Sequence, residues 1–416
     1  MINDARSQIE QFFGVWEFTS HHPPFSTLIL GVCYYLGYLV GNCNLGLFCY
    51  TLLQSISMAI AFALVVKFCV KNWNVIFGVF VLAFFAVFPV WVSFAQAILK
   101  DGLFVAAVVY FFLSLAELIQ SEGSRKNQYI CLGIFGILTS LLRNNGIYII
   151  IGVLLASLFL LKEKKRKKLV CLMTGIVILM QIYSSIILPA FDIKPGSKAE
   201  MLSIPFQQTA LYVKEHGDEI TAEERNTIDS ILAYDVLAEK YQKWISDPVK
   251  ETMKSDADIK EYLKVWIQQL VKHPETYIQA FLNSSVGYYS ISTNNANFWN
   301  YFYSDDPGLV DYSRLFSDLE QMRNCIKNFA SQIQEIPIVR LGYQAGVYTW
   351  LSIIMAWIII RKRKYTGLVI LAPVFISILV CIASPVANCV RYMLPVMAVL
   401  PIVISYTRST CFAKTE

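Results

Sequence analysis

Long apolar stretches separated by short polar segments dominate the chain. A helix needs about 20 apolar residues to cross a bilayer. Nine stretches approach that length, at roughly residues 45–66, 73–92, 102–119, 128–142, 146–161, 168–189, 343–360, 365–383 and 391–407. The composition agrees, because 56% of the residues are hydrophobic, 16% are charged and the mean hydropathy is +0.50. We therefore predict an all-α polytopic membrane protein with about nine transmembrane helices.

Lysine and arginine are concentrated in alternate loops. These basic segments hold Lys67 and Lys71, Arg125 and Lys126, residues 162–168, residues 361–364, and the tail with Arg408 and Lys414. The positive-inside rule places them in the cytoplasm, which makes the other loops external. The net charge is only +5, and the basic residues lie in short loops, so no nucleic-acid partner is expected.

This orientation divides the chain into four predicted segments. Residues 1–44 form an external first loop, 45–189 hold six membrane helices, 190–342 form a mainly helical external domain, and 343–416 hold three more helices and a cytoplasmic tail. Residues 24–41 are apolar enough to span, but the alternation of loops favours a helix lying in the outer interface. A tenth span is the alternative. The ten cysteines form no CxxC pair and no Cys/His cluster, so they indicate neither disulfides nor zinc.

Three external turns each carry one isolated base, namely Lys100, Arg143 and Arg391. Arg143 joins two apolar halves of about 15 residues, each of which covers only about 22 Å of a core about 30 Å thick, so it is expected below the membrane surface. With His21 and His22, these bases suit a phosphate or pyrophosphate at the outer leaflet. The alternative is that each base pairs with a nearby acid or extends to the headgroups.

The first residues predict a short amphipathic helix carrying an acid. In the sequence "NDARSQIEQFFGVW", the residues Ile9, Phe12, Phe13 and Trp16 follow helical spacing and form one apolar stripe, with Asp4 near the helix start. Asp4 could be an ordinary N-cap. As an external carboxylate near a lipid phosphate, it could instead accept a proton from a hydroxyl or hold a divalent cation such as Mg²⁺ or Mn²⁺.

The order of these features resembles the GT-C superfamily of polyprenyl-phosphate-dependent glycosyltransferases, which includes protein O-mannosyltransferases and the aminoarabinose transferase of lipid A. The shared plan is an external acid, a basic residue followed by proline at the head of an interfacial helix, a polar turn between two short membrane helices, and an external domain. The stretches "HHPPFSTLILG", "KDGLF", "LLRNNGIYI", "LSIPFQQTA" and "ASPVANCVRYMLP" are similar to an uncharacterised bacterial family of GT-C-like membrane proteins. The likeness covers nearly the whole chain.

The resemblance implies an inverting glycosyltransferase of the cytoplasmic membrane. A polyprenyl-phosphate sugar would be the donor, and an envelope glycan or protein outside the membrane would be the acceptor. Asp4 would match the catalytic acid of the first loop, His22 the basic residue before proline, and Arg143 the polar turn. The family plan has a further membrane helix before the acid, and we expect the gene to encode one upstream.

Two other functions fit the same pattern less well. An envelope polysaccharide polymerase or ligase also has many spans, basic residues and a large external loop, but it does not need the acid of the first loop. A transporter or flippase for a lipid-linked substrate would place its charges near the midplane and show inverted repeats, which the sequence lacks.

Overall fold

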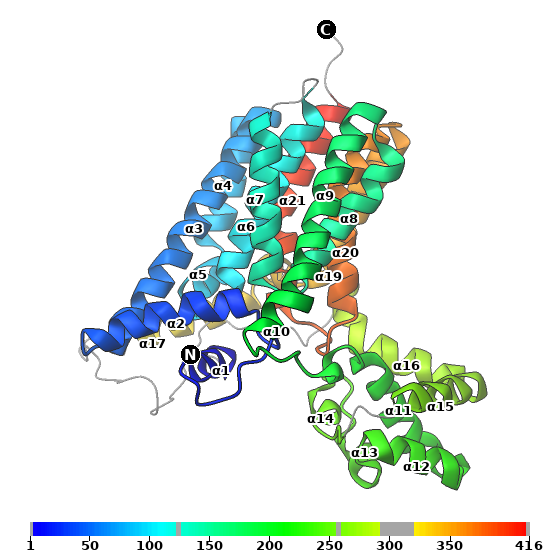
Figure 1. Ribbon diagram of the computed structural model, residues 1–416. Helices are drawn as coiled ribbons and strands as arrows, with labels where there is room; N and C mark the ends of the chain where they lie inside the picture. The colour runs from blue at the N-terminus through cyan, green and yellow to red at the C-terminus, as the bar shows by residue number, and fades with distance from the viewer. Residues whose placement is uncertain (1–2, 122–125, 255–258, 292–319, 413–416) are drawn as a thin grey trace.

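The computed structural model describes residues 3–121, 126–254, 259–291 and 320–412. Across these residues the fold is helical, and β pairing is limited to isolated bridges. A long helical bundle carries a smaller group of helices at one end (Figure 1). The prediction of an all-α membrane protein is confirmed at this level.

Within the described ranges, ten helices build the bundle. They are α3 (Cys43–Asn72), α4 (Val75–Val87), α5 (Pro89–Gln96), α6 (Asp101–Gln120), α7 (Lys126–Leu142), α8 (Gly146–Leu160), α9 (Glu163–Ile182), α19 (Ala345–Arg361), α20 (Leu368–Ile382) and α21 (Val390–Cys411). By length and composition, five helices in the described residues are able to cross a membrane, or up to seven if each bent pair is one span. The nine predicted spans therefore remain a prediction.

One of the predicted spans is broken, and another follows a sharp bend. Residues 73–92 cover α4 and the start of α5, which meet at an angle of 49°. Pro89 causes the break, because proline cannot donate the helical hydrogen bond and disfavours helical geometry in the residue before it. Likewise, α18 (Pro337–Tyr343) and α19 meet at 76° just before the seventh predicted span.

The helices α6 and α21 form the centre of the bundle. In the most apolar 18-residue stretch of each helix, 78% of the residues are buried in α6 and 83% in α21. In the candidate span Glu163–Ala190, which contains α9, the corresponding value is only 11%. A helix that is apolar on every face belongs inside a bundle. Because α6 and α21 both begin at the end that carries the smaller group of helices, their first residues meet there (Figure 1).

The amino-terminal segment folds against this same end. Helix α1 (Asn3–Phe12) packs on α2 (Pro24–Leu39), which runs across the end of the bundle (Figure 1). The ring of Phe12 lies so close to Gly31 that a Cβ there would be 2.2 Å from it. This arrangement fits an interfacial α2, although that position remains a prediction.

The predicted apolar stripe from Ile9 to Trp16 is only half right. Helix α1 ends at Phe12, and Gly14 follows with a φ of 71°, in the left-handed region that favours glycine. Ile9 is buried, but Trp16 lies beyond the helix and is 61% exposed. The stripe therefore stops where the helix stops.

The smaller group of helices has its own core. It comprises α11 (Ser203–His216), α12 (Ala222–Ile231), α13 (Tyr234–Lys240), α14 (Asp247–Lys250), α15 (Ile259–Lys272) and α16 (Pro274–Ser285), and we call it the soluble unit. Phe206, Ile228 and Tyr262 are fully buried in its centre. Two further described helices from the predicted external domain, α17 (Glu320–Glu335) and α18, contact each other and lie outside this group.

The turn before α21 is hydrogen-bonded to the soluble unit. The Ser246 amide donates to the carbonyl of Pro385 at 2.8 Å, and the Ala387 amide donates to the carbonyl of Trp244 at 2.9 Å. The hydroxyl of Tyr288 donates to the carbonyl of Val386, also at 2.8 Å. The start of α21 is therefore attached to both parts of the molecule.

Candidate functional site

Asp101 is the centre of a charged cluster at the end of the bundle. It is the first residue of α6, and its side chain is 1% exposed. One carboxylate oxygen accepts a hydrogen bond from Arg143 Nη1 at 2.7 Å, and the other accepts from Arg391 Nε at 2.6 Å. A buried carboxylate needs such partners, because desolvation of an unpaired charge costs several kcal/mol.

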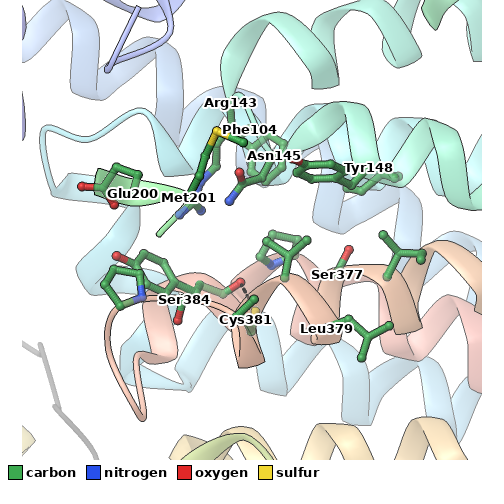
Figure 2. Close-up of a pocket in the computed structure, with 17 residues that line it drawn as sticks. Phe104, Arg143, Asn145, Tyr148, Glu200, Met201, Ser377, Leu379, Cys381 and Ser384 are labelled. Carbon is green, nitrogen blue, oxygen red and sulfur yellow. Dashed lines mark hydrogen bonds between the residues drawn. The ribbon is translucent and has the colours of Figure 1, made fainter. Parts of the chain in front are cut away.

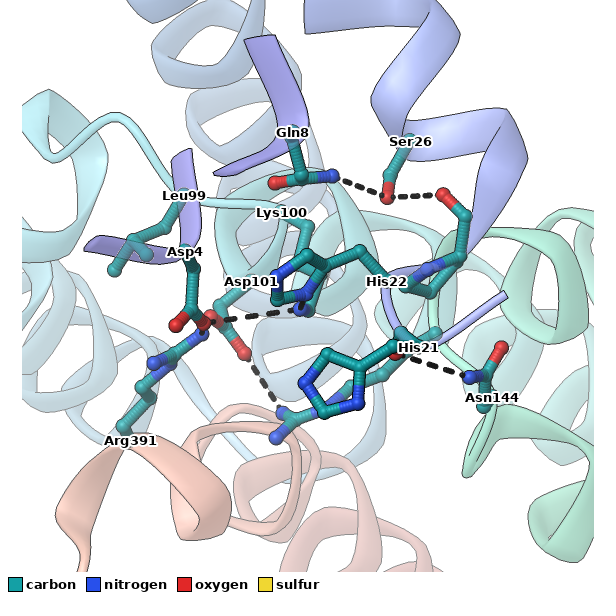
Figure 3. A network of polar contacts seen from close by, with 12 residues as sticks. Asp4, Gln8, His21, His22, Ser26, Leu99, Lys100, Asp101, Asn144 and Arg391 are labelled. Atoms are coloured by element: carbon teal, nitrogen blue, oxygen red, sulfur yellow. Dashed lines mark hydrogen bonds and ion pairs between the residues drawn. The ribbon is translucent and has the colours of Figure 1, made fainter. Parts of the chain in front are cut away.

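Arg391 extends the cluster from α21 to α1. Its Nη2 donates to Asp4 Oδ2 at 2.7 Å, while its Nε remains on Asp101. One guanidinium therefore joins two carboxylates that are far apart in the sequence (Figure 3). Burial alone raises the pKa of the Asp4 carboxyl, but the charges of Lys100 and Arg391 outweigh burial and hold that pKa well below its usual range. Asp4 is therefore ionised at neutral pH.

Lys100 and His22 form the third side of the cluster. Lys100 Nζ lies 3.0 Å from His22 Nδ1 and 3.8 Å from Asp4 Oδ2. Burial lowers the pKa of Lys100 to about 8, against the opposing effect of Asp4. Burial and the adjacent Lys100 charge lower the pKa of His22 to about 3. His22 is therefore a neutral acceptor for the Lys100 ammonium, and it adds no positive charge.

Helix α3 positions the residues that lead into Lys100. Gln54 is fully buried, and its amide nitrogen lies 2.7–3.0 Å from the carbonyls of Phe94, Ala95 and Ala97, which share its two hydrogens. Tyr50 donates to the carbonyl of Leu99 at 3.0 Å. These bonds satisfy backbone groups between α5 and α6, where helical hydrogen bonds are interrupted.

Arg143 is fixed by the tight turn between α7 and α8. The Gly146 amide donates to the carbonyl of Arg143 at 2.8 Å, and a Cβ on Gly146 would lie 2.0 Å from the carbonyl of Thr139. Only glycine allows that approach. The guanidinium of Arg143 lies over the rings of Phe104 and Tyr392, 5.7 and 5.1 Å from their centres.

Arg143 also lines a cavity of about 610 Å³. Arg143 and Asn145 lie on one side of it and Ser384 lies on the other (Figure 2). Its other walls come largely from α8 and α20, where the lining residues Tyr148 and Leu379 are 45% and 56% exposed at the surface of the bundle. The cavity thus has Arg143 at one side and largely apolar walls, and its polar lining also includes the Glu200 carboxylate, which pairs with Lys250.

The cluster contains more charge than the sequence pattern indicated. Lys100, Arg143 and Arg391 supply three cations, and Asp4 and Asp101 supply two carboxylates, which leaves one positive charge. The predicted site residues Asp4, His22, Lys100, Arg143 and Arg391 meet here. His21 lies at the edge, where its ring packs edge-on against His22 and its carbonyl lies 3.5 Å from the Asn144 amide.

Asp101 is the member of the cluster that sequence reasoning missed. The sequence pattern assigned no role to Asp101, but its two oxygens accept from Arg143 and Arg391. The available signal was an acid at the first position of a long apolar helix. An acid at the start of a helix is stabilised by the helix dipole, so its presence there is explained without any functional site.

The fold and the cluster define a helical membrane protein with a buried ion-pair network at one end of its bundle. The chain matches the model of a family of unknown function (DUF6020) over residues 16–411, and it belongs to that family. The match includes Lys100, Asp101, Arg143 and Arg391, and it starts after Asp4. No curated protein and no solved structure gave a significant match.

Proposed function

We propose that this protein is an inverting glycosyltransferase that moves a sugar from a polyprenyl-phosphate donor to an envelope acceptor on the external face of the cytoplasmic membrane. The observation that carries the proposal is the buried cluster of charges beside a cavity with Arg143 at one side and largely apolar walls. A lipid phosphate has the same two parts, an anionic head and a long apolar tail.

The donor's charge matches the cluster. A polyprenyl-phosphate sugar is a phosphodiester with one negative charge, and the cluster has one positive charge. Arg143 faces both the cavity and Asp101, so it is the natural first contact for the phosphate. Its planar guanidinium suits two phosphate oxygens at once. The isoprenoid tail would lie along the apolar walls formed by α8 and α20.

In the proposed reaction, an acceptor hydroxyl attacks the anomeric carbon of the sugar. The bond from that carbon to the phosphate oxygen breaks, and its electron pair stays on the polyprenyl phosphate. The hydroxyl proton moves to Asp4, so charge and atoms balance. The leaving phosphate gains one negative charge, which Arg143, Arg391 and Lys100 stabilise from fixed positions in a buried site.

The ion pairs also set the basicity of Asp4. With Arg391 at 2.7 Å and Lys100 at 3.8 Å, the carboxylate is a weak base. A phosphate that attracts these two cations reduces their effect on Asp4, and its pKa then rises toward the range of a useful general base. Donor binding would thus prepare the base for the acceptor.

The residues present do not favour a divalent cation in the cluster. Asp4 and Asp101 both accept hydrogen bonds from Arg391, and the cluster is already positive. A Mg²⁺ or Mn²⁺ ion would have to displace a guanidinium and add two charges to that excess. The proposed reaction therefore uses no metal at this position.

The test is a transfer assay with purified full-length protein and radiolabelled polyprenyl-phosphate sugars. Incorporation of label into an envelope acceptor, with release of polyprenyl phosphate, would support the proposal. Transfer only from a diphosphate-linked glycan would instead indicate the polymerase or ligase function. Movement of the intact labelled lipid between leaflets of a vesicle, without transfer, would indicate a transporter.

A further inference from the structure

The soluble unit holds a second group of ionisable side chains, distant from the charged cluster in the sequence. His216 ends α11, Glu219 lies in the 3₁₀ turn Gly217–Glu219 that follows, and His273 directly precedes α16. Glu219 Oε1 lies 3.3 Å from His216 Nδ1, and Glu219 Oε2 lies 2.8 Å from His273 Nε2. One possible ligand atom from each of the three residues lies within 4.8 Å of the other two.

The outer nitrogen of each imidazole has its own hydrogen-bond partner. His273 Nδ1 lies 3.1 Å from Glu275 Oε1, and because a carboxylate only accepts, this nitrogen carries the hydrogen. His216 Nε2 lies 3.0 Å from Thr276 Oγ1, whose hydroxyl donates to Glu215 Oε2 at 3.2 Å. The threonine hydrogen is therefore engaged, so His216 Nε2 is the donor to Thr276.

The inner nitrogens, His216 Nδ1 and His273 Nε2, both face the carboxylate of Glu219. Because a carboxylate only accepts, each contact holds a hydrogen on the imidazole nitrogen when no metal is bound. A metal ion that bound these nitrogens would replace those hydrogens. The two rings are also stacked, with centres 3.7 Å apart and planes inclined by 14°, so they must tilt apart for both in-plane lone pairs to reach one ion.

We propose that His216 Nδ1, His273 Nε2 and the Glu219 carboxylate bind a zinc ion. Two imidazoles and one carboxylate are a common zinc ligand set, and ligands about 2.0–2.1 Å from a tetrahedral zinc lie about 3.3 Å from one another. The two nitrogen–oxygen distances of 3.3 and 2.8 Å are close to that spacing. Water would fill the fourth position.

The groups behind the ligands fit the same proposal. Zinc-binding histidines usually donate their other ring nitrogen to a carboxylate or another acceptor, which fixes the tautomer and makes the ligating nitrogen more basic. Glu275 does this for His273, and Thr276 does it for His216. The ion would join the end of α11 to the start of α16 and so stabilise the soluble unit. This proposal is independent of the proposed sugar transfer.

The experiment measures zinc binding to full-length protein purified in detergent without a histidine tag and stripped with a chelator. Competition with a chromogenic chelator should give one zinc ion per chain. Glu219→Gln should weaken binding by at least about 100-fold, and Glu275→Ala, which removes the acceptor for His273 Nδ1, by about 10-fold. Glu219 is 54% exposed, so its replacement leaves the core intact.

Two matched controls localise the effect. Glu261→Gln removes an exposed carboxylate on α15, and His21→Gln removes an imidazole beside the charged cluster, outside the soluble unit. Both variants should bind zinc as the wild type does. Zinc should also raise the Tm of the wild type and of both controls, but not that of Glu219→Gln.

The proposal is overturned if wild type and Glu219→Gln bind zinc equally, or if zinc leaves the Tm of both unchanged. In that case protons alone occupy the space between the imidazoles and the carboxylate. Loss of binding in His21→Gln would also overturn it, because the ion would then lie at the histidine pair beside the charged cluster.

Discussion

Ion pairs of the same length occur in the charged cluster and on the soluble unit, in very different surroundings. Arg391 and Asp101 are 2.6 Å apart with side chains 13% and 1% exposed, whereas Lys264 and Glu261 are 2.7 Å apart with both side chains 57% exposed. An exposed pair typically contributes about 0–1 kcal/mol, but removal of one partner from a buried pair costs about 3–5 kcal/mol. Distance alone therefore does not indicate what an ion pair does.

The largest expected effect is on stability, from Asp101→Asn. The asparagine amide keeps the shape of the side chain but removes the carboxylate that pairs with Arg143 and one of the two that pair with Arg391. We expect a loss of about 3–5 kcal/mol in the free energy of unfolding, measured by denaturant titration in detergent. Glu261→Gln should change little. Equal losses in the two variants would contradict the distinction between buried and exposed pairs.

The next effect is on chemistry, from Asp4→Asn. Asparagine is about as good as aspartate at a helix start, so α1 should stay folded. If Asp4 is the base, sugar transfer should fall by about 10²-fold or more, as loss of a general base typically does, with donor binding nearly unchanged. The transfer assay measures the rate, with Glu10→Gln on the same helix as control. If the Asp4→Asn variant transfers sugar at the wild-type rate, Asp4 is not the general base.

A smaller effect is expected for Arg143→Lys, which keeps the charge but loses the planar pair of donors. Binding of the polyprenyl phosphate should weaken by about 10-fold, as the loss of one charge-assisted hydrogen bond implies. Arg225→Lys is the matched control, because Arg225 on the soluble unit also pairs with an aspartate and lies over a tyrosine ring, yet is exposed. Equal lipid binding by wild type and Arg143→Lys would return Arg143 to a structural role.

The smallest effect concerns pH and His22. Burial and Lys100 lower the pKa of His22 from 6.5 to about 3, with Arg391 and His21 acting in the same direction and Asp4 opposing. Between these values the unfolded chain binds a proton that the folded chain does not. Stability should therefore fall as the pH falls below about 6.5, by at most about 1.4 kcal/mol per pH unit.

Thermal unfolding at pH 6.5 and pH 5.5 measures this dependence. His22→Gln retains an acceptor for Lys100 but does not titrate, so its loss of stability over that interval should be smaller. His21→Gln changes the exposed neighbour and should behave as the wild type does. If His22→Gln and the wild type lose the same stability, His22 titrates normally.

The sequence indicated the members of the cluster better than their partners. An isolated base in an apolar context is a local feature, so Lys100, Arg143 and Arg391 could be selected from the pattern. Their contacts are not local, because Arg391 meets Asp101 across 290 positions and Asp4 across 387. Without a fold, no spacing rule connects such residues.

The same limit explains what was missed in the soluble unit. His216 and Glu219 are three positions apart, but His273 lies more than fifty positions further along the chain. Residue spacing in the sequence therefore gave no indication of a metal site here. Helix ends were also uncertain, because packing decides them, as the early end of α1 at Phe12 shows.

The attachment of the soluble unit to the turn before α21 has a thermodynamic consequence. That turn leads within a few residues to Arg391, so a displacement of the soluble unit is also a displacement of the guanidinium that joins both carboxylates. Linkage makes such a relation reciprocal. Suppose that a ligand binds the cluster more tightly when the soluble unit is in one of two positions. Binding of that ligand then shifts the soluble unit toward this position. An acceptor that holds the soluble unit in the same position strengthens the binding of the ligand by the same factor.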